Sequence, residues 1–190
     1  SHGTAKTMVE ALGLPSAVRR NGRITPVPVG YKTRQIPFTA ERDWFAMTIP
    51  WGDVSTAYYT TGIPNIETYT GISPKTYRWV KWQRYLAWFL RLSWVKAFLK
   101  RRIESGPAGP SDEQRERSQS LVWGQVTDEE GHAHTARLTT LEGYTLTAMT
   151  SLMITKKVLE GEVFPGHQTP AGAYGADLVM ELPSTKREDL

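Results

Sequence analysis

The stretch from Ile49 to Asn65 constrains the fold more than any other, because residues that break strands and helices recur in it at short intervals. Pro50 has no N–H group to donate within a sheet, and Gly52 tolerates a left-handed backbone. A strand that reaches Ile49 must therefore end there, and the chain must turn before the next element begins.

A short helix is predicted directly after this turn, over Val54–Thr61. Asp53 suits its N-cap, because a carboxylate accepts hydrogen bonds from the unpaired amides of the first helical turn. Gly62 suits a left-handed residue at the helix end, and Pro64 prevents the helix from resuming. The sequence thus predicts a polar crossover between two strands.

The crossover carries polar and aromatic side chains on a segment that is held at both ends, which is where binding residues often lie. These side chains either form a binding site or only complete the hydrogen bonds of a well-capped connection. They are Trp51, Asp53, Thr56, Tyr58, Thr61 and Asn65.

The composition excludes several classes of protein. Apolar residues make up 39% and charged residues 22% of the 190, which is typical of a globular chain and predicts one domain over residues 1–190. The absence of cysteine excludes disulfides, thiolate metal sites and cysteine nucleophiles. No apolar run is long enough to predict a transmembrane helix. We expect a cytoplasmic protein, with association with a membrane surface as the alternative.

Hairpin and helix signals come in clusters along the chain, not as alternating strand–helix–strand units. This order predicts an α+β fold with a mostly antiparallel sheet and helices packed on one face. Hairpins are predicted to turn at Asn21-Gly22, within Val18–Pro28, and at Asp128–Gly131, between Ser118–Thr127 and His132–Leu141. The other predicted elements are helices over Gly3–Leu12, Pro74–Glu104 and Gly143–Leu159, strands over Thr33–Phe38, Trp44–Ile49 and Asn65–Thr70, a short element over Ala173–Leu182, and a fraying tail from Pro183 to Leu190.

The segment Pro74–Glu104 is predicted to be one long, aromatic-rich helix. It holds four of the seven tryptophans, and no acidic residue lies between Lys75 and Arg102. Apolar side chains surround its axis from Tyr85 to Val95, so it must be buried or face something apolar. It is either a core helix or a segment that lies in a membrane interface. The apolar centre does not suit a surface that tracks phosphates, so no nucleic-acid partner is expected.

Several nucleotide and catalytic motifs are absent. The chain has no G-x-G-x-x-G and no G-x-x-x-x-G-K-[S/T], so it carries no recognisable nucleotide site. It also lacks the G-x-S-x-G of serine hydrolases and the H-E-x-x-H of zinc peptidases. His132 and His134 share one face of a strand, but histidines beside a turn are commonly solvated, so no metal site is predicted.

The loop Phe164–Gly175 is a second candidate site. Three glycines and two prolines among its residues restrict the backbone path. Thr169 followed by Pro170 predicts a helix start, with free amides over Ala171–Ala173 that could hold an anion or a carboxylate. The alternative is a structural turn.

These two stretches and a third short segment carry a combined motif. Its parts are Ile49-Pro50-Trp51-Gly52-Asp53-Val54-Ser55-Thr56-Ala57-Tyr58, Thr61-Gly62-Ile63-Pro64-Asn65-Ile66-Glu67, Glu142-Gly143-Tyr144 and Pro165-Gly166-His167-Gln168-Thr169-Pro170-Ala171-Gly172-Ala173-Tyr174-Gly175. Together they resemble the C-terminal half of the saccharopine dehydrogenase-like oxidoreductases, in the branch that includes trans-acting enoyl reductases. Gly3-Thr4-Ala5 matches the start of that half, and Gly106–Pro110 matches its central loop.

The resemblance implies an oxidoreductase that uses NAD or NADP, bound by an N-terminal Rossmann domain that is missing from this chain. The start at Ser1-His2, without methionine, also indicates a domain excised from a longer protein. Residues 1–190 would then be a substrate-side and oligomerisation domain that is inactive and binds no cofactor by itself. The expected partners are the Rossmann domain, a second copy in a homodimer formed through edge strands, and a lipid or acyl substrate or a membrane surface.

The same motifs supply the predicted site residues. Tyr58 and Asp53 are the catalytic candidates, because a phenol can hydrogen-bond to a developing alkoxide. Thr4 is the candidate for a cofactor contact. The predicted substrate-binding residues are Trp51, Thr61, Asn65, Tyr144, His167, Thr169 and Tyr174. The alternative function is a non-enzymatic module that binds lipid or a membrane interface through the aromatic helix.

Overall fold

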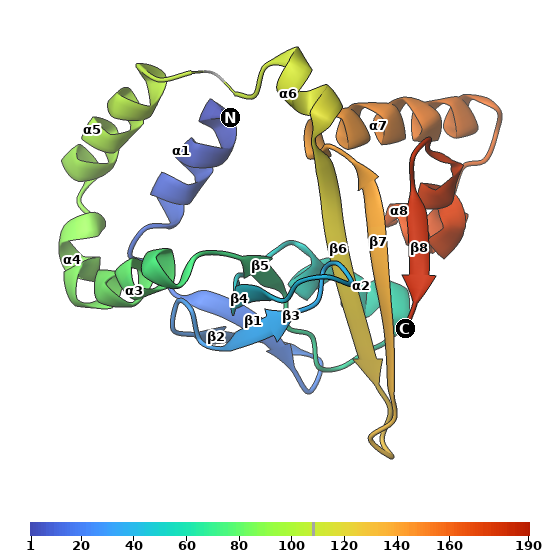
Figure 1. The fold of residues 1–190 in the computed structure, drawn as a ribbon, viewed down its shortest axis with the longest axis horizontal. Coiled ribbons are helices and arrows are strands. Elements are labelled where there is room, and N and C mark those ends of the chain that lie inside the picture. The colour runs from blue at the N-terminus through green and yellow to red at the C-terminus, as the bar shows by residue number, and fades with distance from the viewer. Residues whose placement is uncertain (108) are drawn as a thin grey trace. The chain divides into compact units, whose positions relative to one another are not determined.

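The computed structural model, drawn as a ribbon in Figure 1, describes residues 1–107 and 109–190. The chain divides into two compact units. The units are Ser1–Gln35 with Trp44–Pro110, and Ile36–Asp43 with Ser111–Leu190. Ala108, within the loop that the resemblance places in the centre of the domain, lies outside the described residues. The expectation that residues 1–190 act as one substrate-side domain stays a prediction.

The first unit contains the hairpin that Asn21-Gly22 predicts. β1 (Ser16–Arg20) pairs antiparallel with β2 (Arg23–Val27). Asn21 and Gly22 both have positive φ, at 48° and 77°. Positive φ at both central residues is the signature of a type I′ turn, whose twist matches that of the two strands.

A second, three-stranded sheet has the order β3-β4-β5, with β4 and β5 antiparallel. Its strands are β3 (Thr33–Ile36), β4 (Trp44–Thr48) and β5 (Tyr69–Gly71). The last strand begins later than the predicted Asn65–Thr70, because Ile66 pairs only through an isolated bridge with Arg19. The crossover therefore returns to the hairpin before it enters this sheet.

The predicted single helix over Pro74–Glu104 is wrong, because a 3₁₀ turn and an extended residue interrupt it. Leu92 has φ −64° and ψ 132°, outside the helical region. An unbroken helix of this length would run about 46 Å in one direction, whereas the break lets the last part lie beside α1 (His2–Ala11). The observed elements are α3 (Pro74–Trp82), η1 (Gln83–Leu86), α4 (Ala87–Leu90) and α5 (Ser93–Glu104).

The second unit is built on a sheet with the order β6-β7-β8. Its strands are β6 (Gln119–Thr127), β7 (Ala133–Leu141) and β8 (Lys186–Asp189), and its helices are α6 (Asp112–Arg117), α7 (Gly143–Leu159), α8 (Pro170–Tyr174) and η2 (Ala176–Glu181). The prediction of a fraying tail is wrong. β8 pairs antiparallel with β7, and Glu188 forms an ion pair with Arg137 at 2.8 Å.

Antiparallel sheets and helices occur in both units, which confirms the α+β fold class. The strands of the described residues form three sheets where one was expected. Val18, Ala46 and Val54 are buried in the first unit, and Leu178 and Leu182 in the second. Among the helices of the described residues, none combines the length and the apolar character that crossing a membrane requires.

Candidate functional site

The crossover of the first unit is built around α2 (Asp53–Thr61). Gly62 ends this helix in the left-handed region, with φ 71°, as predicted. The start differs, because Gly52 occupies the N-cap and Asp53 is the first helical residue. The predicted capping role of Asp53 is therefore wrong. Its exposed carboxylate instead lies in the first helical turn, where negative charge favours the helix dipole.

Arg19, which is buried in β1, fastens α2 to the β1–β2 hairpin. Its Nε donates to the Val54 carbonyl at 2.8 Å and its Nη2 to the Ser55 carbonyl at 3.1 Å. Its Nη1 donates to the Gly22 carbonyl at 2.6 Å. A buried cation needs such charge-assisted bonds to offset the loss of its hydration. One side chain therefore sets the position of the first turn of α2 on the hairpin.

Tyr58 packs on the same guanidinium. The Cζ of Arg19 lies 4.5 Å from the centroid of the Tyr58 ring, within cation–π range. The Tyr58 hydroxyl lies next to the hairpin turn, since a Cβ added to Gly22 would come within 3.4 Å of it. The ring of Tyr59 meets the Tyr58 ring edge-on at 5.7 Å. The half-buried phenol of Tyr58 is thus held in one orientation, and its role as a proton donor stays a prediction.

Thr61 and Asn65 complete backbone hydrogen bonds. Thr61 Oγ1 donates to the Ala57 carbonyl at 2.7 Å and accepts from the Ile63 amide at 3.2 Å. Asn65 Oδ1 accepts from the Asn21 amide at 2.9 Å. The hydrogen bonds of both side chains agree with the interpretation of the crossover as a well-capped connection. Both residues are exposed.

A hydrogen-bonded triad beside the crossover was not predicted from the sequence. The Tyr69 hydroxyl donates to Glu67 Oε2 at 2.7 Å, and Lys32 Nζ donates to Glu67 Oε1 at 2.5 Å. Glu67 and Tyr69 are two residues apart in an extended segment, so their side chains share a face. The alternation of side chains along a strand could therefore have predicted the contact between Glu67 and Tyr69. The contact of Lys32 with Glu67 depends on the tertiary structure.

The environment of the triad shifts two pKa values in opposite directions. Burial raises the pKa of the Tyr69 phenol well above its usual range, and the hydrogen bond to Glu67 raises it further. Burial also raises the pKa of Glu67, but the hydrogen bonds from Lys32 and Tyr69 outweigh this and leave it below its usual value. Glu67 is therefore a carboxylate at neutral pH, held between two donors.

In the second unit, the predicted helix start at Thr169 is confirmed. Thr169 Oγ1 accepts from the Gly172 amide at 3.0 Å, and its carbonyl accepts from the Ala173 amide at 2.9 Å. These two amides are thus used within the chain, and the prediction that they are free to hold an anion is wrong. The helix that follows, α8, is only five residues long.

Tyr174 closes the loop that contains Thr169. Its hydroxyl donates to the Glu162 carbonyl at 3.0 Å, and its ring packs edge-on against Phe164 at 5.6 Å. His167 lies exposed on the same loop. The loop is therefore held by its own side chains, as the interpretation as a structural turn expects.

The Glu142-Gly143-Tyr144 motif forms the start of α7. Glu142 Oε2 accepts from the amides of Tyr144 at 2.9 Å and Thr145 at 3.2 Å, which caps the helix. The Tyr144 side chain is exposed. An open hollow of about 480 Å³ adjoins the motif, lined by Glu142 and Thr145 and by charged side chains of α6 that include Asp112 and Arg115.

The structure thus distributes the predicted site residues over both units. The second unit holds Tyr144, His167, Thr169 and Tyr174, and the first holds Thr4, Trp51, Asp53, Tyr58, Thr61 and Asn65. Within the first unit, all of these but Thr4 lie on the crossover. Thr4 is in the first turn of α1, where its hydroxyl lies 3.2 Å from Ser1 Oγ, and the Trp51 indole is about half exposed.

The turn between β6 and β7 brings together Asp128, Glu130 and His132, whose potential ligand atoms lie within 4.8 Å of one another. Asp128 Oδ1 accepts from the amides of Glu130 at 3.0 Å and His132 at 2.8 Å. Asp128 Oδ2 lies 3.0 Å from His132 Nδ1. These hydrogen bonds are those of a tight, exposed turn, and they account for the cluster without a metal ion.

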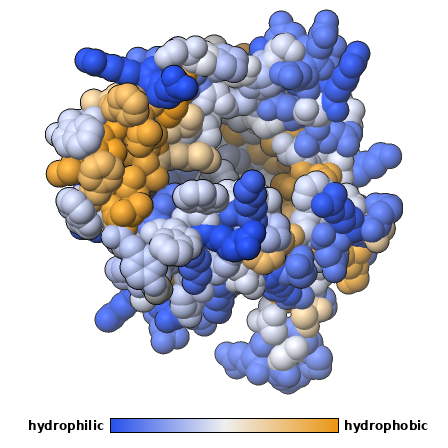
Figure 2. All heavy atoms as spheres, turned by 60° about the vertical axis from the view of Figure 1, so that its left-hand side comes forward, coloured by the Kyte–Doolittle hydropathy of each residue, from blue (hydrophilic) through white to orange (hydrophobic). Residues whose placement is uncertain are grey.

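A second candidate site is the aromatic surface, which we define as the exposed large hydrophobic side chains from Trp79 to Phe98. Of the two alternatives for this segment, the core helix does not hold for Trp82 and Trp88, which are 66% and 69% exposed. Figure 2 shows a hydrophobic patch over α4 and α5, with hydrophilic side chains at its edges. The aromatic surface comprises Trp79, Trp82, Tyr85, Leu86, Trp88, Leu92, Trp94 and Phe98.

Comparison of the chain with models of known protein families and with curated protein sequences found no match to either.

Proposed function

We propose that this chain is the substrate-side part of an oxidoreductase that uses NAD or NADP and resembles the saccharopine dehydrogenase-like enzymes. The observation that carries the proposal is the combination of four motif segments, each weak alone and specific together. Several motif positions also have demanding backbone roles. Gly62 and Gly175 have positive φ, of 71° and 89°, and the side chains of Asn65 and Thr169 hydrogen-bond to backbone amides.

In this proposal the nicotinamide supplies the hydride when it is bound. The chain lacks a Gly-rich phosphate-binding turn, so the dinucleotide is bound by another domain. In this proposal residues 1–190 hold the substrate and deliver the proton that accompanies each hydride. Tyr58 is the proposed proton donor, because its ring is held in place. Arg19 is then a positioning residue that acts through Tyr58.

The test is to compare the chain with the full-length protein that contains it. We expect the chain alone to bind neither NADH nor NADPH, and the full-length protein to bind one of them in the micromolar range, measured by calorimetry. In the full-length protein, Tyr58→Phe should lower kcat about 100-fold or more and leave the affinity for the dinucleotide unchanged.

Micromolar binding of a dinucleotide by the chain alone would refute the proposal that another domain binds the dinucleotide. A full-length protein with no affinity for either dinucleotide would refute the oxidoreductase itself. Wild-type kcat in Tyr58→Phe would remove Tyr58 as the proton donor and leave the rest of the proposal in place.

The exposure of Trp82 and Trp88 supports a second candidate, a module that binds lipid or a membrane interface and catalyses nothing. The two candidates differ in what precedes the chain. A Gly-rich strand–turn–helix upstream supports the enzyme, and its absence supports the module.

A further inference from the structure

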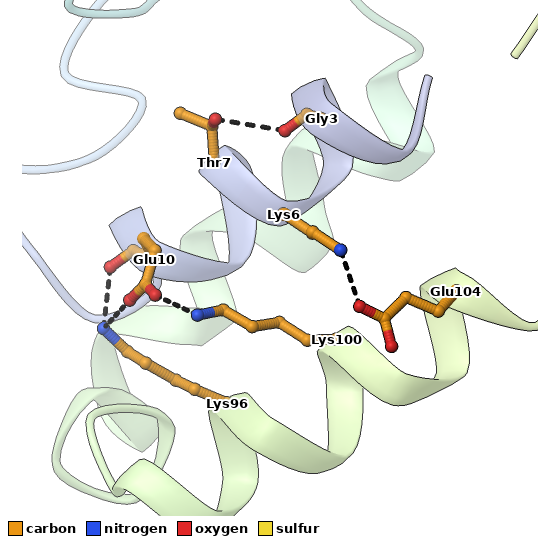
Figure 3. Close-up of polar contacts among 7 residues, drawn as sticks. All are labelled: Gly3, Lys6, Thr7, Glu10, Lys96, Lys100 and Glu104. Atoms are coloured by element: carbon orange, nitrogen blue, oxygen red, sulfur yellow. Dashed lines mark hydrogen bonds and ion pairs between the residues drawn. The ribbon is translucent and has the colours of Figure 1, made fainter. Parts of the chain in front are cut away.

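α5 has two faces, and its contacts with α1 identify the inner one. Val95 is buried, and Lys96 and Lys100 both form ion pairs with Glu10 (Figure 3). Lys6 of α1 pairs with Glu104 at 2.6 Å at the far end of the helix. These contacts fix the rotation of α5 about its axis, because Lys96, Lys100 and Glu104 follow one another at intervals of four residues and therefore share one side of the helix.

The outer face of α5 is therefore defined as well. Trp94 and Phe98 are four residues apart, so they lie one above the other. They are 61% and 64% exposed. Arg101 and Arg102 follow on the next turn, and both are exposed. The outer face thus consists of two large apolar side chains, followed by two cationic side chains on the next turn.

α3 repeats this arrangement. Lys75, Arg78, Trp79 and Trp82 fall at intervals of three and four residues, on one side of the helix. Together they line an open, almost entirely apolar hollow of about 460 Å³. The stems of long cationic side chains cover apolar surface while their charges stay in water. Each of the two helices therefore presents tryptophan beside cations.

The charges of this segment have one sign. No aspartate or glutamate lies between Lys75 and Arg102 in the sequence. Lys96 and Lys100 share the single carboxylate of Glu10 on the inner face. Lys75, Arg78, Arg101 and Arg102 adjoin the aromatic surface, so this side of the unit is both apolar and positively charged. Its complement is a surface that is apolar and negative.

We propose that the aromatic surface binds the interface of an anionic lipid bilayer, an inference that rests on the lipid-binding candidate above. Tryptophan and arginine are the side chains that take headgroup depth in such an interface. α3 has nine residues and α5 has twelve, too few to span a bilayer. The helices lie in the plane of the membrane, with the indole rings at the acyl boundary and the cations at the phosphates.

The test uses the chain with vesicles of neutral phosphatidylcholine, and with vesicles that also contain about 30% phosphatidylglycerol as the anionic lipid. We expect the protein to sediment with the anionic vesicles and its tryptophan emission to shift to shorter wavelength. Trp82→Ala with Trp88→Ala should lower the partition coefficient about tenfold or more. Lys75→Gln with Arg78→Gln should lower the partition coefficient for anionic vesicles only. About 0.5 M NaCl should likewise lower the partition coefficient of the wild type for anionic vesicles only.

Tyr59→Ala is the matched control, because Tyr59 is an exposed aromatic residue of the same unit outside the aromatic surface. It should bind as the wild type does. Equal binding to neutral and anionic vesicles would overturn the anionic preference and leave the lipid-binding candidate intact. No sedimentation with either kind of vesicle at low salt would refute both the anionic preference and the lipid-binding candidate.

Light scattering without lipid tests whether a second copy of the chain, instead of a membrane, covers the aromatic surface. A dimer that the tryptophan substitutions dissociate, with no vesicle binding, would assign the aromatic surface to a second copy of the chain and overturn the proposal. None of these outcomes depends on a dinucleotide, so the oxidoreductase proposal is tested separately.

Discussion

Arg19 and Tyr58 form a cation–π pair, with the Cζ of Arg19 4.5 Å from the centroid of the Tyr58 ring. The same guanidinium donates to the carbonyls of Val54, Ser55 and Gly22. One buried side chain thus connects a strand, a hairpin turn, the start of a helix and the proposed proton donor. Replacing it tests the stability of the first unit and the orientation of Tyr58 together.

Arg19→Met should destabilise the protein by about 3 kcal/mol, because one buried and two partly buried backbone carbonyls lose their donor. The free energy of unfolding from urea denaturation measures this. Arg20→Met is the control, since Arg20 donates from an exposed position to the Tyr31 hydroxyl, and it should cost less than about 1 kcal/mol. Equal losses in the two variants would show that the carbonyl contacts of Arg19 contribute little.

Gly62→Ala should destabilise the protein by about 1 kcal/mol or more through backbone strain alone. Gly62 has φ 71°, which an L-residue with a Cβ adopts at a cost. A Cβ at Gly62 would meet no atom within 4 Å, and the same is true of Gly52, whose φ is −52°. Gly52→Ala is therefore a control without strain and should be neutral or slightly stabilising. Equal effects in thermal denaturation would contradict this account of the crossover.

Glu67 should make the stability of the protein depend on pH in the acid range. Its pKa in the folded state lies below its ordinary value of 4.5, so its ionised form stabilises the fold above that pH. This contribution is lost as the pH falls from 4.5 through the folded-state pKa. Glu67→Gln should be less stable than the wild type at neutral pH and equal to it in acid.

Urea midpoints at neutral pH and at an acidic pH at which Glu67 is protonated in the folded protein measure the effect of Glu67→Gln. Glu113→Gln, which replaces an exposed glutamate of α6, serves as the control for a general effect of charge. A difference between Glu67→Gln and the wild type that is the same at both pH values would rule out the ion pair as its source.

The edge of the β6-β7-β8 sheet should mediate the expected homodimer. β6 has nine residues and pairs with only one strand of its sheet, and its Val122 and Val126 are about half exposed. Long apolar edge strands pair with other chains, and a lysine on the edge opposes this. Val126→Lys should raise the dimer dissociation constant about tenfold, measured by light scattering.

Leu159→Lys adds the same charge at an exposed position of α7, and it should leave the dimer unchanged. A wild-type chain that is monomeric at all concentrations would contradict the dimer. A dimer that neither substitution weakens would place the contact elsewhere.

Features that depend on a few neighbouring residues were determined by the sequence alone. Asn21-Gly22 specifies its hairpin turn, Gly62 the end of α2, and Thr169-Pro170 the start of α8, because each is decided by dihedral preferences and by bonds within a few residues. The α+β class follows from the order of such local signals. The helix over Gly143–Leu159 was predicted with its observed bounds for the same reason.

Features that depend on partners far along the chain were decided only by the tertiary structure. Leu92 breaks the aromatic helix where α5 packs on α1, and residues 186–189 become a strand because β7 offers an edge. The meeting of Lys32 with Glu67, and of Arg19 with Tyr58, joins segments more than thirty residues apart. The same holds for exposure: periodicity left open whether Trp82 and Trp88 are buried, since an apolar helix is covered only if another element packs on it.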